Sequence, residues 1–126
     1  MGPDLIALVL PFPPSVNRYW RVSPRGCGVL LSKEGREYRR RVRLQLVGWS
    51  RPPIETPVAV AFDAYPPDRR RRDGDNLIKA PLDCLVHAGL LLDDHLVRRV
   101  SLELHEADPP GRLGATRIGV QGVVGA

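Results

Sequence analysis

The segment PVAVAFDAY, residues 57–65, decides the fold because it is the clearest strand in the chain. It is rich in β-branched and aromatic residues that favour extended backbone, and Pro66 and Pro67 end it. Shorter apolar or alternating segments on either side predict the strands that accompany it. These predicted strands cover residues 5–10, 28–31, 97–105 and 115–124.

A basic helix is expected over residues 33–49, before this strand. Tyr38, Val42 and Trp49 recur at helical spacings, while arginines occupy the other faces. Ser32 suits the N-cap. Upstream, residues 11–21 begin with prolines, which remove backbone donors. They are expected to form an extended, ordered loop.

A second helix is expected after the central strand. Asp75 is predicted to cap it, and it should run to about His87 or Ala88. Gly89 fits the position after the last turn, where left-handed backbone is favoured. Pro81 requires that the first turns be irregular or that it lie early in the helix.

The predicted order of elements is β-β-α-β-α-β-β. It indicates an α+β (mixed α/β) fold, with a mixed sheet of about four to five strands and two main helices packed on it. The 126 residues, 43% hydrophobic and 26% charged, are expected to form a single small domain, residues 1–126.

The net charge of +5 is unevenly distributed. Residues 1–50 hold nine basic and three acidic side chains (+6), whereas residues 51–126 hold ten and eleven (−1). A basic surface attracts polyanions. The first part is therefore predicted to face DNA, and the second to hold the acidic chemistry.

Cysteine usage and hydropathy indicate a cytoplasmic protein without membrane association. Cys27 and Cys84 form no C-x-x-C pair, so both thiols are expected to be reduced. No apolar stretch approaches the length of a membrane span or looks like a signal peptide.

The segment RRRRDGDN, residues 69–76, runs from four guanidinium groups directly into carboxylates, and Lys79, Asp83 and Asp93–Asp94 follow. Arginines attract phosphate, but carboxylates repel it unless a divalent cation lies between them. Such a segment is typical of a metal held against a nucleic-acid backbone.

Asp73 and Asp75 are two residues apart, so an extended backbone would point both to one side. Asp94 is the best candidate for a third carboxylate, which tertiary folding must bring back. Magnesium prefers oxygen ligands and keeps several waters, so two or three carboxylates suffice. Lys79 follows Asp75 by one helical turn and is expected to reach a phosphate oxygen.

Other interpretations of these residues fit the sequence less well. An EF-hand fails because Ile78 and Cys84 stand where glycine and glutamate are needed. The cysteine and histidine spacing matches no common zinc site. An isolated D-x-D usually caps a helix or pairs with arginine, and Tyr19 and Trp20 suit a core or dimer contact as well as base stacking. The combined order of the motif favours chemistry.

Residues 73–94 resemble the core of the RusA family of Holliday junction resolvases, and residues 13–21 look like that family's opening motif. The resemblance implies a homodimeric, Mg²⁺-dependent endodeoxyribonuclease, with Mn²⁺ as a substitute. It would resolve four-way junction DNA by paired symmetric nicks in recombination and repair.

Carried over by position, the resemblance implies that Asp73, Asp75 and Asp94 are the essential metal ligands and Lys79 the catalytic lysine. Asn76 and Asp93 would support the site. The residues expected to bind DNA are Asn17, Arg18, Arg21, Arg36, Arg39, Arg40, Arg43, Arg69, Arg70, Arg71 and Arg72.

Three rival functions remain open from the sequence. The first is a non-catalytic module that binds branched DNA. The second is a metal-dependent nuclease with another substrate, such as flaps, forks or RNA. The third is a phosphoryl-transfer enzyme or small-molecule phosphatase, which the basic surface and the missing phosphate loop disfavour.

Overall fold

The computed structural model describes residues 5–26, 28–107 and 114–123. Its main sheet has four strands in the spatial order β1-β6-β4-β5. Their bounds are β1 (Leu5–Pro11), β4 (Val58–Tyr65), β5 (Val97–Leu104) and β6 (Ala115–Gly122). Strands β4 and β5 are parallel, whereas β6 is antiparallel to β1 and β4. The mixed sheet and the α+β class are therefore confirmed.

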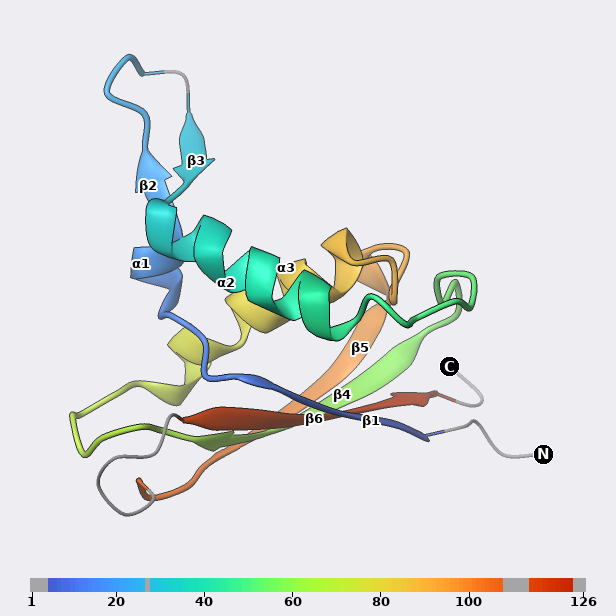
Figure 1. Ribbon diagram of the computed structural model, residues 1–126. Coiled ribbons are helices and arrows are strands. Elements are labelled where there is room, and N and C mark those ends of the chain that lie inside the picture. The colour runs from blue at the N-terminus through green and yellow to red at the C-terminus, as the bar shows by residue number, and fades with distance from the viewer. Residues whose placement is uncertain (1–4, 27, 108–113, 124–126) are drawn as a thin grey trace.

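Helices α2 (Lys33–Gln45) and α3 (Lys79–His87) cover one face of this sheet, and no helix of the described chain covers the other (Figure 1). The predicted strand at residues 28–31 is not part of the main sheet. It forms β3 (Val29–Leu31), which pairs only with β2 (Trp20–Val22) in a hairpin that projects beyond the start of α2 (Figure 1).

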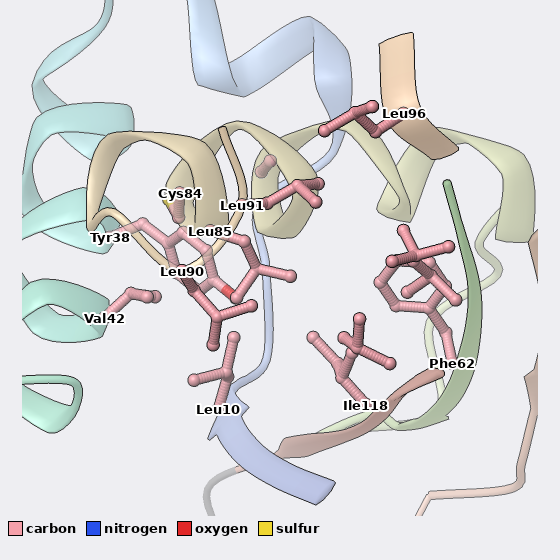
Figure 2. Packing of buried hydrophobic residues seen from close by; sticks show 14 of the residues in the cluster. Leu10, Tyr38, Val42, Phe62, Cys84, Leu85, Leu90, Leu91, Leu96 and Ile118 are labelled. Atoms are coloured by element: carbon pink, nitrogen blue, oxygen red, sulfur yellow. The ribbon is translucent and has the colours of Figure 1, made fainter. Parts of the chain in front are cut away.

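The core lies between the helices and the sheet. Figure 2 shows Tyr38 and Val42 of α2 and Leu85 of α3 on the helical side, with Phe62 and Ile118 on the sheet side. Each is at most 3% exposed. Burying a side chain of this size stabilises the fold by about 1.5–3 kcal/mol. The periodicity that predicted α2 therefore identified its core face correctly.

Helix α2 begins as predicted and ends early. The Ser32 hydroxyl accepts a hydrogen bond from the Gly35 N–H at 2.8 Å, which caps the first turn. The helix stops at Gln45, so the prediction that it continues to Trp49 is wrong. Gly48 explains the difference, because glycine weakens a helix. The chain closes there in a tighter turn, with the Trp49 N–H donating to the Leu46 carbonyl at 2.9 Å.

Residues 11–21 are not wholly an extended loop. After the prolines, the chain forms the short helix α1 (Val16–Tyr19) and then enters β2. Tyr19 is fully buried, which assigns it to the core. Asn17, Arg18 and Arg21 are exposed, as predicted. Burial of Tyr19 stabilises the helical turn of α1. The prolines nearby do not predict this turn.

The acidic motif leads into a 3₁₀ helix, η1 (Gly74–Leu77), before α3 begins at Lys79. Ile78, and not Asp75, is at the N-cap of α3, so the predicted cap is wrong; Asp73 is at the N-cap of η1. Pro81 is the third residue of α3, where its missing N–H costs little. Gly89 follows α3 with a φ of 84°, which confirms its predicted role.

Strands β5 and β6 confirm the last two predicted strands, except that β6 ends at Gly122. The turn predicted at residues 109–111 and the strand end at Val124 lie outside the described residues. Within the described part of the chain, no helix has the length and apolar character needed to cross a bilayer.

Gly35→Ala is expected to destabilise the protein by at least about 2 kcal/mol, although alanine normally strengthens a helix. A β carbon at Gly35 would lie 2.3 Å from the backbone oxygen of Tyr19, which α1 and the core hold in place. Thermal or urea unfolding measures the change. Gly48→Ala is the control, because a methyl group there meets nothing within 4 Å. Equal stabilities of the two variants would contradict this account.

Candidate active site and nucleic-acid groove

The arginine run lies in the loop between β4 and η1, where Asp68 organises it. The Arg72 guanidinium pairs with Asp68 at 2.7 Å, lies 5.1 Å from the centre of the Phe12 ring and is 14% exposed. Arg70 pairs with the same carboxylate at 3.3 Å. The backbone N–H of Arg70 and the Arg72 side chain lower the pKa of Asp68. Arg69 and Arg71 are exposed.

This loop forms one wall of a groove of about 790 Å³, and α2 forms the other. Of the predicted site residues, the groove brings together Arg18, Arg70, Arg71, Arg72, Asp73 and Asn76. It thus places four arginines beside one of the predicted metal ligands. Such an arrangement suits a phosphate backbone, because guanidinium groups bind phosphate oxygens in pairs.

Asp73 and Asp75 do not share the predicted extended geometry. Asp73 has extended backbone (φ −96°, ψ 120°), but Asp75 lies within η1. The i, i+2 argument therefore does not apply. The Asn76 N–H donates to the Asp73 carbonyl at 3.1 Å, which closes the turn and places Asn76 beside Asp73 in the groove. The side chains of Asp73 and Asp75 are both exposed.

Tertiary folding brings Asp94 back to the start of α3. After Gly89 the chain reverses, and the buried Leu90 and Leu91 anchor the return. Asp94 then begins the 3₁₀ helix η2 (Asp94–Leu96), and its Oδ2 lies 3.3 Å from the Nζ of Lys79. The lysine and the aspartate, fifteen residues apart, therefore meet at the surface.

Asp93 holds this turn in shape. Its carboxylate accepts a hydrogen bond from the His95 N–H at 3.2 Å and so caps η2. That bond, followed by contacts with Asp94 and the His95 side chain, lowers the pKa of Asp93. The side chain thus fixes the backbone that carries Asp94.

The donor chemistry of Asp73, Asp75 and Asp94 suits a hard divalent cation, because all three are carboxylates with access to solvent. Within the described residues, three potential metal ligands come within 4.8 Å of one another at one place. That place is formed by Asp63, Glu103 and His105, not by the three predicted carboxylates. Exposed carboxylates repel one another without a cation between them, and Asp94 is held by Lys79.

The predicted arginines of α2 fall into two groups: Arg39 forms an ion pair with another helix, and the others are at the surface. Arg39 pairs with Asp83 of α3 at 2.6 Å, and Asp83 also accepts a hydrogen bond from the hydroxyl of buried Tyr19. These contacts of Asp83 join α1, α2 and α3. Burial first, and then this bond, raises the pKa of Tyr19.

The other predicted arginines of α2 remain at the surface. Arg40 pairs with Glu37 at 2.7 Å, and Arg36 donates to the Leu31 carbonyl at 2.9 Å. Arg43 is exposed. None of these three lines the groove. Their predicted contacts with DNA would therefore involve the part of the helix surface outside the groove.

Two groove cations were not predicted. Lys33 and Arg41 line the α2 wall, together with the ring of Phe12 at its end. A signal was present in the sequence, since Arg41 follows Tyr38 by three residues and Glu34 by seven. That spacing places it on the same helix face as the core-facing tyrosine.

Comparisons with known proteins show the family to which this sequence belongs. The sequence profile of the family described as Endodeoxyribonuclease RusA matches residues 11–118. The crossover junction endodeoxyribonuclease rusA of Enterobacteria phage HK97 is 40% identical over 108 residues, which are 84% of this chain and 88% of the phage protein. The crossover junction endodeoxyribonuclease RusA of Escherichia coli K12 is 44% identical over 89 residues, which are 70% and 72% of the two chains. The chain therefore belongs to the RusA family of endodeoxyribonucleases.

Proposed function

We propose that this chain is a Mg²⁺-dependent endodeoxyribonuclease that resolves four-way DNA junctions by paired symmetric nicks, acting as a homodimer in the cytoplasm during recombination and repair. The observation that carries the proposal is the groove, which places Asp73 and Asn76 beside five arginines. The names of the relatives supply the substrate class.

The arginines hold the DNA backbone. Arg18, Arg70 and Arg71 present guanidinium groups along the groove, while Asp68 and Phe12 position Arg72. Such contacts give affinity without sequence information. Selectivity for junctions then comes from the shape of branched DNA and from the two-fold symmetry of the dimer.

Lys79 and the carboxylates perform the chemistry at the scissile phosphate. Asp73, Asp75 and Asp94 hold the cation, for which Mn²⁺ substitutes. When bound, the cation acts as a Lewis acid that offsets the negative charge of the carboxylates and of the phosphate. Water would attack the phosphorus while the bond to the 3′ oxygen breaks. The Lys79 ammonium, which lies 3.3 Å from Asp94, would neutralise the charge that grows in the transition state. The products are 5′-phosphate and 3′-hydroxyl ends.

A synthetic four-way junction and a matched linear duplex test the proposal directly. Each is incubated with the protein with and without Mg²⁺, and the products are separated on a denaturing gel. We expect symmetric nicks in the junction only, and only with the cation. Equal cleavage of both substrates would indicate a general nuclease, and binding without cleavage a non-catalytic module.

Replacing Arg70 and Arg71 together by alanine is expected to weaken junction binding and to flatten its salt dependence. If both contact phosphates, the slope of log K against log salt should fall by roughly two. Binding titrations at several salt concentrations measure this slope. Arg51→Ala/Arg98→Ala, which removes two exposed arginines outside the groove, is the matched control. An unchanged slope would exclude Arg70 and Arg71 from the interface.

A further inference from the structure

The hairpin of β2 and β3 carries an apolar stripe along one of its faces. Residues that pair in register across antiparallel strands have their side chains on the same face, and so do residues two apart along a strand. The register pairs Trp20 with Leu31 and Val22 with Val29. These four side chains therefore form two successive pairs on one face of the hairpin.

The two pairs differ in what covers them. Trp20 and Leu31, at the base of the hairpin, are partly buried and pack against the hydrophobic core. Val22 and Val29 are 77% and 61% exposed. Figure 1 shows the hairpin projecting beyond the start of α2, with no other described element beside its outer part. The stripe thus continues from the core into solvent, where two valines remain largely uncovered.

The charge around the hairpin indicates the class of partner. From Arg18 to Lys33 the sequence has four basic residues and no acidic one. Arg18 and Lys33, which precede β2 and follow β3, both line the groove, so the groove reaches the base of the hairpin. A cationic element at the end of a cationic groove suits a polyanion. Because the chain belongs to a family of endodeoxyribonucleases, that polyanion is DNA.

We propose that Val22 and Val29 form a wedge that packs against the base pairs exposed at the branch point of a four-way junction. Their aliphatic side chains have no hydrogen-bonding groups, so they suit the apolar face of a base pair rather than its edge or a phosphate. Proteins that insert such side chains between base steps combine them with cations. Arg21, exposed on the opposite face of the hairpin, supplies one.

A wedge of this kind gives selectivity for junctions, which is the part of the proposed function on which this inference rests. Insertion into a linear duplex requires that a base step be unstacked, which costs free energy. Stacking is already interrupted or rearranged at a branch point, so insertion there costs less. The valines are removed from water in both cases. The net free energy of binding is therefore more favourable on the junction.

A second copy of this chain is the other partner that the valines could contact. Two hairpins that met each other would bring two cationic segments together without an acidic residue between Arg18 and Lys33 to offset them. Like charges in contact weaken such an interface. DNA, by contrast, is attracted by the same cations. The charge therefore favours the nucleic acid.

Val22→Ser combined with Val29→Ser removes the apolar surface and leaves every charge in place. Binding is measured without divalent cation, so that the DNA stays intact, on a synthetic four-way junction and on a linear duplex with the sequence of one arm. We expect affinity for the junction to fall at least about tenfold and affinity for the duplex to change less than about twofold. An unchanged affinity for the junction, or an equal loss on both substrates, would overturn the wedge.

Leu44→Ser combined with Val47→Ser is the matched control. It removes two exposed aliphatic side chains, 56% and 82% accessible, that lie outside the groove and the hairpin. This variant should bind both substrates as the unaltered protein does. A similar loss of junction affinity in the control would show that the effect is not specific to the hairpin, and would overturn the proposal.

A fluorescent base reports the contact itself. 2-Aminopurine becomes brighter when it is unstacked, and it is placed in the junction beside the branch point. Saturating unaltered protein should raise its fluorescence, whereas the double serine variant at saturation should not. Val22→Ile combined with Val29→Ile keeps the apolar surface and should retain the increase. An equal increase with the serine variant would contradict the wedge.

Two further results separate the wedge from the proposed function. If the unaltered protein neither prefers nor cleaves four-way junctions, the proposed function fails and the wedge fails with it. If it cleaves junctions and the serine variant keeps the full preference for them, only the wedge fails. Light scattering on both proteins completes the test, because loss of self-association in the serine variant would assign the valines to a second copy instead.

Discussion

Replacing Asp73 by Asn is expected to lower the rate of junction cleavage at least about 1,000-fold, because the cation loses a charged ligand. Asp75→Asn and Asp94→Asn should have the same effect. Junction binding should be unchanged or tighter, since less negative charge then faces the phosphates. Single-turnover cleavage and a binding titration on the same junction measure the two quantities separately.

Asp68→Asn is the matched control, because it makes the same chemical change in the same loop. Asp68 pairs with Arg70 and Arg72. Its replacement should alter binding and leave cleavage at saturating protein within about tenfold of normal. If Asp73→Asn cuts junctions at the normal rate, the assignment of that carboxylate to the metal is wrong.

Lys79→Met is expected to slow cleavage about 100-fold while leaving the fold intact, because the ammonium stabilises charge in the transition state. The Lys79–Asp94 pair is about half exposed, with side-chain accessibilities of 45% and 51%. An exposed pair contributes less than about 1 kcal/mol to stability. Lys79→Met should therefore lower the cleavage rate strongly and change the thermal unfolding of the protein little.

The chain offers a matched control in its other lysine. Lys33→Met removes the same charge from the α2 wall of the groove. It should weaken binding a few-fold, as expected for one lost phosphate contact, and should not reproduce the loss of rate. Equal slowing by both variants would assign Lys79 to DNA binding rather than to catalysis.

The predicted secondary structure is correct where local chemistry and burial favour the same conformation. The β-forming segment at Val58–Tyr65 became the central strand β4, and Ser32 caps α2 because its hydroxyl meets a free backbone N–H. Gly89 adopts the positive φ that its position suggested. These features depend on neighbours within a few residues, so sequence spacing is sufficient to find them.

Errors arose where distant contacts decide. Tyr19 forms a helical turn because its ring is buried and its hydroxyl binds Asp83, sixty-four residues away. Glycine normally weakens a helix, but Gly35 is required where α2 touches the Tyr19 backbone. Arg39 resembled a surface cation, and it is partly buried in an ion pair between helices.

The candidate site shows the same division. Its candidate reactive groups, Asp73, Asp75, Lys79 and Asp94, were proposed from their order in the sequence, since charge and donor type are properties of the residues themselves. Their positions were not, because the 3₁₀ turn at Asp75 replaced the expected extended geometry. Asp93 serves Asp94 by capping η2, which spacing alone did not predict.

By itself, the sequence determined the class of fold, the basic and acidic halves of the chemistry and the family to which the chain belongs. These follow from composition, periodicity and a motif that is continuous along the chain. Only the tertiary structure decided that Lys79 meets Asp94, that Arg18 and Arg41 share a groove with Asp73, and that one sheet face stays open. Such relations depend on how separate elements pack, and packing is set by contacts between residues that are far apart in the chain.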